Sequence, residues 1–375
     1  MIRLASLPAC RLPCSCCESV ERGTLSASTT NNICTTNTMK AVVVRELGDA
    51  SVLSVEVDYP NPPDELKPGE VLIKNEFAGL NFIDTYFRSG LYKKTPPFIA
   101  GQEGGGTVAK STVDKFKVGD RVVYMMFGSY AEYTIVSDEE GKIVKIPDDV
   151  PGLTMEIAVA SMVQSLTAHY LVTDATAGLI RPGEWCLIYS VGSGTCQWAA
   201  QMAKIQGYKV IGTTSKSKAS TAPKCCDELI ILDTVPGKMY ANYESVDIVS
   251  KVMDITQGQG CKCIIDGVGK STADISLQVL AQRGIFISFG NASGAVPEFP
   301  VLRLSPKSAF VTRPKLGDYI STAKELDRRT NDVFQWISEG KLSISIDKVF
   351  SLDQASEGHV YLESGKSTGK VLYRI

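Results

Sequence analysis

The sequence predicts an α/β protein that combines a parallel, doubly wound sheet with a second, mostly β region. Between residues 182 and 218 the chain reads as strand, glycine-bearing turn, helix and strand. Beyond residue 218, short apolar runs alternate with stretches of helical periodicity, which is the pattern of a parallel sheet covered by helices. Before about Pro147, by contrast, short strand-like runs are separated by turns.

The segment 182–218 contains the first unit of the predicted sheet. Trp185–Tyr189 is a short apolar run after a Pro-Gly turn, and Lys209–Gly212 is a second such run. Ser190–Thr195 is small and carries glycines, and Gln197–Gly207 has apolar residues at helical spacing. A helix that opens after such a turn directs free N–H groups and a positive dipole end at a phosphate. The sequence therefore predicts a dinucleotide-binding domain of the Rossmann type.

The charges around this unit favour NADP(H) over NAD(H). No acidic residue occurs between Glu184 and Asp227, whereas an NAD site normally has a carboxylate about 20 residues beyond the glycine turn. Thr213–Lys218 places hydroxyl and ammonium groups there instead, which suit a 2′-phosphate. A solvated basic loop is the alternative interpretation of the same residues.

Length and composition indicate a soluble globular protein of two domains. The chain has 375 residues, of which 44% are apolar and 21% charged, and its net charge is −2. This balance gives no reason to expect a nucleic-acid or membrane partner. No apolar run approaches the roughly 18 residues that a membrane-spanning helix needs.

Residues 1–38 differ in composition from the rest of the chain. They contain Arg3, Arg11 and Arg22 with only two acids, many Ser and Thr residues, and five of the eleven cysteines. An Arg- and Ser-bearing, acid-poor leader resembles an organellar transit peptide. We therefore expect a mitochondrial presequence, or else a disordered extension or a little-used upstream start, so that the location is mitochondrial or cytoplasmic.

The remaining cysteines suggest neither a disulfide framework nor a zinc framework. Residues 39–185 contain no cysteine, and the sequence has two histidines, His169 and His359. Cys261 and Cys263 precede an apolar pair, so we expect them to pack inside a buried strand as reduced thiols. The two histidines are expected to pack or to face solvent rather than to catalyse.

Strands predominate in the first region, and strands alternate with helices afterwards. Gly101–Gly106 must be a loop or a close approach of two backbones. The further predicted strands are Met39–Val44, Glu70–Phe77, Tyr130–Val136, Ile230–Leu232, Cys263–Ile265, Ile285–Gly290, Ile344–Phe350 and Val371–Arg374. Val118–Tyr124 is predicted to be a turn that leads into another strand. The further predicted helices are Thr154–Val172, Val246–Thr256, Ser271–Gln282 and Ala323–Ser338. The last strands are expected to return to the first domain.

Several longer sequence words resemble the medium-chain dehydrogenase/reductase superfamily. The zinc-free NADPH:quinone oxidoreductases of the zeta-crystallin type carry motifs similar to Gly79–Tyr92, Gly284–Gly294, Val311–Pro314 and Leu362–Lys370. The resemblance covers the whole chain after the leader. It implies NADPH as the cofactor and a quinone or another activated enone as the substrate.

The same resemblance implies the domains and the residues of the site. It places a GroES-like catalytic domain over 39–164 and 311–375 and a Rossmann domain over 165–310. The implied catalytic residues, which line the cleft beside the nicotinamide, are Asn81, Asp84, Tyr86 and Tyr92. The implied cofactor contacts are Thr167, Gly192, Ser193, Gly194, Thr195, Ser215, Lys218, Tyr243, Phe289, Gly290, Asn291, Ser293, Arg313 and Lys370. Among these, Ser215 and Lys218 match the 2′-phosphate site, and Arg313 and Lys370 match basic residues near the phosphates.

The chain departs from the family pattern around the phosphate turn. Relatives usually carry glycines where Ser193 and Cys196 stand, and a cysteine adds bulk where helix and strand pack closely. Gly267 stands where a serine is common, and residues 236–240 lengthen the loop before Tyr243. These changes bear on cofactor affinity rather than on the fold.

The resemblance, together with the composition, predicts chemistry without a metal. Zinc-dependent relatives hold their metal with Cys, His and Glu of the first domain, whereas residues 39–168 contain no Cys or His. Hydride delivery to an activated acceptor needs no Lewis acid. The carbonyl oxygen of a quinone or enone takes up the charge, and water can supply the proton.

Two other functions stay open. A mitochondrial 2-enoyl thioester reductase of the same superfamily would suit the leader. However, residues 81–84 read Asn-Phe-Ile-Asp, as in quinone reductases, rather than Asn-Pro-Ser-Asp. A nucleotide-binding sensor or crystallin-like protein with little turnover is supported only by the altered glycine turn. By analogy with relatives we expect a homodimer with a small-molecule substrate.

Overall fold

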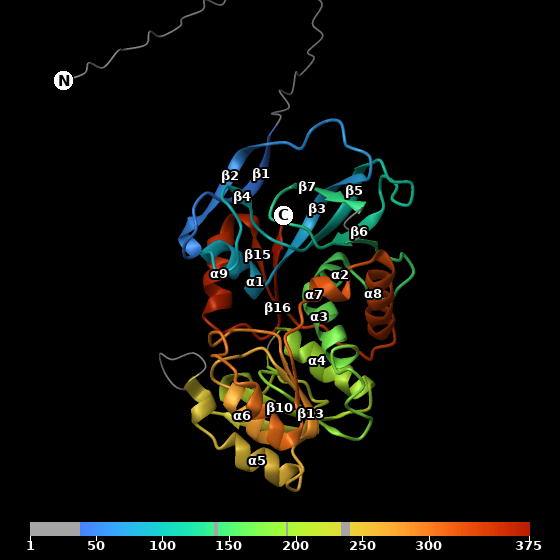
Figure 1. Ribbon diagram of the computed structural model, residues 1–375. Helices are drawn as coiled ribbons and strands as arrows, with labels where there is room; N and C mark the ends of the chain where they lie inside the picture. Colours follow the sequence, from blue (N-terminus) through green and yellow to red (C-terminus); the bar gives the residue numbers. More distant parts are fainter. Residues whose placement is uncertain (1–37, 139–141, 193, 234–240) are drawn as a thin grey trace, which may run out of the picture. The chain divides into compact units, whose positions relative to one another are not determined.

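Six parallel strands form one sheet of the computed structural model (Figure 1). They are β9 (Trp185–Ile188), β10 (Lys209–Ser215), β11 (Glu228–Leu232), β12 (Cys261–Asp266), β13 (Leu280–Ser288) and β14 (Phe310–Thr312). Their order is β11-β10-β9-β12-β13-β14, which is that of a doubly wound dinucleotide-binding sheet, as predicted. The structure describes residues 38–375 apart from 139–141, 193 and 234–240.

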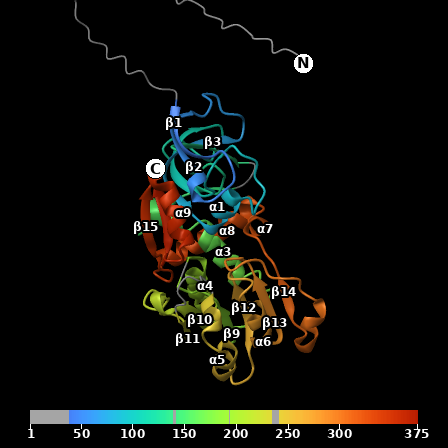
Figure 2. The ribbon, with the colours of Figure 1, turned by 90° about the vertical axis from the view of Figure 1, so that its left-hand side faces the viewer.

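Alternate residues of these strands pack against helices on opposite faces of the sheet (Figures 1 and 2). Ile188 and Val210 belong to a buried cluster with α3 and α4, whereas Leu187 and Ile211 belong to a cluster with α5 and α6. Burial on both faces explains why the strands read as continuous apolar runs. The four helices are α3 (Val163–Val172), α4 (Gly194–Ile205), α5 (Ile248–Ile255) and α6 (Ala273–Val279).

The other half of the fold contains two sheets, with strand orders β2-β1-β4 and β15-β16-β3-β5-β6-β8, and β7 pairs with β3. The C-terminal strand β16 runs antiparallel to β3, so the end of the chain returns to the first domain. The strands are β1 (Thr38–Val44), β2 (Leu53–Pro60), β3 (Glu70–Leu80), β4 (Phe98–Ile99), β5 (Gly104–Ser111), β6 (Arg121–Tyr124), β7 (Tyr133–Ser137), β8 (Ile143–Lys145), β15 (Ile346–Ser351) and β16 (Lys370–Arg374). Two helices accompany them, α1 (Phe82–Ser89) and α9 (Ala355–Glu363).

The glycine-rich stretch Gly101–Gly106 is partly a strand, because β5 begins at Gly104. The close approach of two backbones that was expected for this stretch is present between β5 and β3. A Cβ on Gly106 would lie 1.9 Å from the carbonyl oxygen of Lys74 on β3, so only glycine lets the two backbones meet there.

The predicted helix over Thr154–Val172 is two helices, α2 (Met155–Ala160) and α3. The helical conformation is interrupted at Met162, whose ψ of −90° is not helical. The break frees the backbone N–H of Val163, which donates to Glu103 Oε2 at 2.7 Å. Apolar periodicity continues across the break, so it could not reveal the two helices.

Two predicted boundaries differ from the structure. The helix predicted over Ser271–Gln282 ends at Val279, because the residues from Leu280 onward form β13. The predicted domain limit at 310/311 falls inside β14, which pairs with β13 of the parallel sheet. After β14, α7 (Leu316–Tyr319) and α8 (Ala323–Ser338) pack against α3. Residues 37–375 form one compact unit, so the remaining domain limits stay a prediction.

Both histidines are buried. The Nδ1 atom of His169 lies 2.9 Å from the Arg329 guanidinium, and that of His359 lies 3.0 Å from the Arg88 guanidinium. Both therefore pack, which is one of the two placements predicted for them. Cys261 and Cys263 are buried free thiols of β12, as predicted.

None of the described helices has the length and apolarity needed to cross a membrane.

Candidate active site

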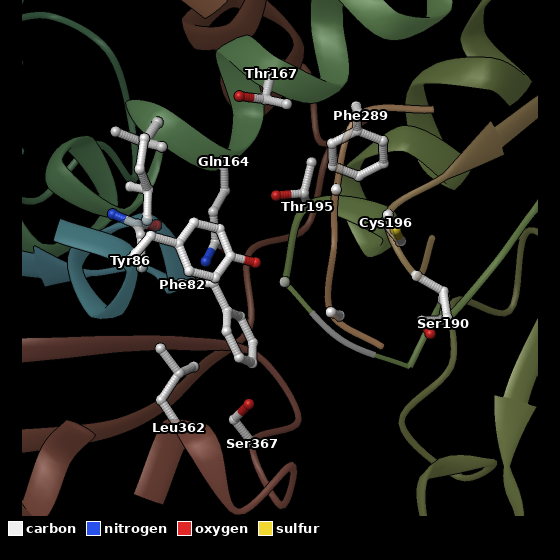
Figure 3. Close-up of a pocket in the computed structure, with 18 of the residues that line it drawn as sticks. Phe82, Tyr86, Gln164, Thr167, Ser190, Thr195, Cys196, Phe289, Leu362 and Ser367 are labelled. Carbon is white, nitrogen blue, oxygen red and sulfur yellow. The ribbon is translucent and has the colours of Figure 1, made fainter. Parts of the chain in front are cut away.

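A continuous pocket of about 1420 Å³ lies where α1, α3 and the turn before α4 meet. Figure 3 shows Tyr86 of α1, Gln164 and Thr167 of α3, and Thr195 around the cavity. The parallel sheet contributes the loops that follow β9, β10 and β13, which is where sheets of this kind bind ligands. The other half of the fold contributes α1 and residues 362–369.

The turn after β9 presents backbone to the pocket at the start of α4. Gly192, Gly194, Thr195 and Cys196 all line the pocket, and Ser193 lies outside the described residues. A Cβ on Gly192 would lie 2.5 Å from Thr214 Oγ1, so the turn requires glycine at this position. The thiol of Cys196 is accommodated with 6% exposure, and burial raises its pKa to about 12, which keeps it neutral.

Two buried polar atoms that line the pocket have no hydrogen-bond partner among the described residues. They are Gln164 Oε1 and Thr214 Oγ1. An unsatisfied buried polar atom costs about 1–3 kcal/mol. Thr214 belongs to the hydroxyl-bearing stretch Thr213–Lys218 of the sequence interpretation, whereas Gln164 was not singled out there.

The basic loop after β10 faces the same part of the pocket. Ser215 and Lys218 both line it, and a Cβ on Gly192 would lie 2.9 Å from the Cβ of Lys218. Burial lowers the pKa of Lys218, as expected for an ammonium group partly removed from water. The structure thus brings these two predicted 2′-phosphate residues to the glycine turn.

Lys370 does not line the pocket, and its expected place near the cofactor phosphates stays a prediction. It is the first residue of β16, its side chain has no exposed surface, and its ammonium group pairs with Glu103. It also donates to Asn81 Oδ1 at 2.9 Å. Lys366, four residues earlier in the same sequence word, is exposed and lines the pocket instead.

Tyr243 lines the pocket beside the glycine turn. Its hydroxyl lies 2.7 Å from Ser190 Oγ, and its ring packs edge-on against Tyr189 at 5.7 Å. Burial raises the pKa of Tyr243, so the phenol remains neutral.

The loop after β13 contributes only some of its predicted residues. Phe289 and Gly290 line the pocket, and Arg313 donates to the carbonyl oxygens of Ser288 and Gly290, both at 3.0 Å. Arg313 thereby holds this loop in place. Asn291 and Ser293 do not line the pocket, and their contact with the cofactor stays a prediction. The Ser293 hydroxyl donates to the carbonyl of Val268 and so joins this loop to the loop after β12.

Aromatic rings from α1 and the following turn form a wall on the other side of the pocket. Tyr86 and Tyr92 pack edge-on at 5.3 Å, and Phe87 packs against Tyr92 at 5.6 Å and Phe127 at 4.8 Å. All four line the pocket. Burial raises the pKa of Tyr86. Such a wall suits a flat, apolar ligand.

Asn81 and Asp84 hold α1 rather than reach into the cavity. Asp84 accepts the backbone N–H of Asn81 at 2.8 Å and the hydroxyl of Tyr130 at 3.2 Å, and it is absent from the pocket lining. Asp84 thus lies on the buried side of α1, and its expected role beside the nicotinamide stays a prediction. Asn81 does line the pocket, but its amide is bonded to Glu103 and Lys370.

The described residues contain no group of three or more His, Cys, Asp or Glu side chains placed to hold a metal ion.

Two family models match the chain. An alcohol dehydrogenase GroES-like domain matches residues 67–148, and a zinc-binding dehydrogenase domain matches residues 237–372.

Individual relatives match most of the chain. A quinone oxidoreductase of Pseudomonas aeruginosa is 36% identical, over 83% of this chain and 92% of the relative. A 2-haloacrylate reductase of a Burkholderia species is 31% identical, over 89% of this chain and 98% of the relative. The crystal structure of Escherichia coli quinone oxidoreductase complexed with NADPH has a TM-score of 0.80 and 33% identity. That match covers 90% of this chain and 100% of the other.

Replacing Asp84 with asparagine should change how stability depends on pH. Burial raises the pKa of Asp84 from its ordinary value of 3.8 to about 7. Between these values the folded protein keeps a proton that the unfolded chain has released, so this carboxyl lowers the free energy of unfolding as pH rises. An asparagine side chain cannot ionise. Between pH 4 and 7, the free energy of unfolding of D84N should therefore rise relative to that of the wild type by up to about 1.4 kcal/mol per pH unit.

Urea unfolding of both proteins at several pH values measures this difference. Other titrating groups, including His359, whose pKa burial lowers to about 3, act in both proteins and cancel from the comparison. A difference that stays constant with pH would show that Asp84 is ionised in the folded protein throughout this range.

Proposed function

Because the chain belongs to the quinone oxidoreductase family, we propose that it is an NADPH-dependent reductase that delivers hydride to quinones or other activated enones. The observation that carries this proposal is the composition of the pocket. One cavity joins a glycine turn with basic and unpartnered polar groups to an aromatic wall, so a dinucleotide and a flat acceptor fit side by side.

The residues at the sheet end of the pocket fit NADPH. The N–H groups that open α4 and the glycine turn suit the pyrophosphate, and Lys218 with Ser215 suits the 2′-phosphate. Gln164 and Thr214 also line this part of the pocket. When bound, NADPH supplies the hydride.

The residues at the other end would bind and orient the acceptor. The rings of Tyr86, Tyr92 and Phe127 provide apolar faces for a conjugated substrate, and Met125 and Met126 complete an adaptable surface. No cysteine or histidine occurs in residues 39–168, so the proposed chemistry relies on the acceptor itself to take up charge. The proton then comes from water or from the Tyr92 hydroxyl.

A 2-enoyl thioester reductase is the second candidate, because Tyr92 is placed in the pocket where it could protonate an enolate. A nucleotide-binding sensor is less well supported, since the altered turn still presents Gly192 and Gly194 to the pocket. The relative named as a 2-haloacrylate reductase supports activated alkenes as acceptors.

An acceptor screen combined with Tyr92→Phe separates the two enzymes. We expect the wild type to oxidise NADPH rapidly with ortho-quinones and slowly with enoyl thioesters, and we expect Y92F to change quinone turnover only a few-fold. Loss of a general acid would instead cost about 10²–10⁴ in rate. The screen is repeated after dialysis against a chelator, which should leave activity intact. Rapid enoyl thioester reduction that Y92F abolishes would refute the quinone assignment.

Lys218→Ala should shift the choice of cofactor. Loss of a charge-assisted phosphate contact costs about 1.5–3 kcal/mol, so NADPH should bind roughly tenfold or more weakly and NADH nearly as before. Lys216→Ala is the matched control, because Lys216 is exposed and does not line the pocket. Fluorescence titration with both cofactors measures the constants. Equal losses for NADPH and NADH would exclude a 2′-phosphate role for Lys218.

The composition of residues 1–38 supports a mitochondrial location as a further proposal. A fluorescent protein fused behind these residues should enter mitochondria, while the chain starting at Met39 should keep its turnover. A uniform cytosolic signal would favour a cytoplasmic protein with an N-terminal extension.

A homodimer is proposed by analogy with relatives and from the edge of the parallel sheet. Val301, Leu302 and Phe310 lie beside or on the edge strand β14 with exposures of 76%, 82% and 48%. Apolar groups of this size at a sheet edge suit a protein partner. Sedimentation velocity should give the mass of two chains for the wild type and of one chain for the double variant V301D/L302D. A wild-type monomer would refute the proposal.

A further inference from the structure

The carboxylate of Glu103 is bonded to three separate segments around the pocket. Its Oε1 atom accepts from Lys370 on β16 and, at 2.8 Å, from the side-chain amide of Asn81. Its Oε2 atom accepts the backbone N–H of Val163 at 2.7 Å. The side chains of Glu103 and Lys370 have no exposed surface, so water does not compete for these bonds.

The bond to Val163 fixes the start of α3. Val163 is the first residue of this helix, and the break between α2 and α3 leaves its N–H without a helical partner. A carboxylate at this end also meets the positive end of the helix dipole. Because Gln164 and Thr167 follow on the pocket side of α3, Glu103 determines where these two side chains stand.

The bonds to Asn81 fix the start of α1 in the same way. Asn81 is the residue immediately before this helix, and both ends of its amide are used. Its nitrogen donates to Glu103, and its oxygen accepts from Lys370. Since α1 carries Tyr86 and leads into Tyr92, the same carboxylate also anchors the aromatic wall.

The fold reserves space for this carboxylate at Gly79 on β3. A Cβ on Gly79 would lie 1.9 Å from Glu103 Oε1, so any larger residue would displace the carboxylate. The backbone N–H of Gly79 donates to the Glu103 carbonyl at 3.1 Å, which holds the two chains together at this point.

We propose that Glu103 is a positioning residue for hydride transfer, which sets the separation between the acceptor wall on α1 and the cofactor-facing side of α3, with Lys370 as its counter-charge. This inference rests on the proposed function. Glu103 does not line the pocket, so it acts through the segments that it holds. Reacting atoms must stand about 3–3.5 Å apart, so a shift of α3 relative to α1 lowers the rate more than it weakens binding.

Two variants test the role of Glu103 while avoiding an unpaired buried charge. Glu103→Asp keeps the charge but is one methylene shorter, so it cannot reach both Lys370 and Val163. The double variant E103Q/K370M removes both charges together. Both variants should bind NADPH within a few-fold of the wild type, and their kcat with an ortho-quinone should fall by about 10- to 100-fold.

Hydrogen exchange provides a readout that needs no turnover. Backbone amides at the start of α3 should exchange faster in both variants than in the wild type. Val136→Ala is the control for lost stability, because Val136 is buried on β7 and is not part of the pocket. It should alter neither kcat nor the exchange at α3.

Three results would overturn the positioning role. The first is wild-type kcat in E103D and E103Q/K370M, and the second is unchanged exchange at α3 in both. The third is an equal loss of NADPH affinity and kcat, which would indicate a general structural defect. If the wild type reduces no acceptor, the proposed function fails, while the exchange experiment still decides whether Glu103 holds α3.

Discussion

The buried ion pair between Glu103 and Lys370 is the interaction on which the arrangement of the site depends. Both side chains are completely removed from water, which is tolerable only when each charge has close partners. To supply them, the fold brings β16, the start of α1 and the start of α3 to one point. The pairing of β16 with β3 places Lys370 beside the carboxylate.

The ion pair links two regions that bind different kinds of chemical group. The sheet half offers backbone N–H groups, cationic side chains and unpartnered polar atoms, which suit phosphates and a carboxamide. The other half offers edge-on aromatic rings, which suit a flat conjugated molecule. A reaction that passes a hydride between two bound molecules needs these regions at a fixed separation, and a buried polar network provides a more rigid link than apolar contacts do.

Helix geometry explains why some of the predicted site residues line the pocket and others do not. Tyr86 and Tyr92 line the pocket, whereas Asp84, two positions before Tyr86, faces the buried side of α1. Positions two apart on a helix do not share a face, so a continuous sequence word cannot place all of its residues in one cavity. The segment 362–370 is also divided in this way. Lys366 lies in a loop at the pocket, whereas Lys370 is the first residue of a buried strand. In the loop after β13, the hydrogen bond from the Ser293 hydroxyl to the Val268 carbonyl holds this side chain away from the pocket.

Local sequence patterns determined the strand–turn–helix unit at Trp185–Ser215, the parallel order of the sheet and the cationic character of the loop after β10. These features depend on neighbouring residues and on apolar periodicity, which a sequence displays directly. The break before α3, the burial of Lys370 and the lack of a partner for Gln164 Oε1 within the described part of the chain were decided by the tertiary structure. Each arises from a partner far away in the chain. Glu103, for example, lies 60 residues before Val163 and 267 before Lys370, and no local pattern encodes such contacts.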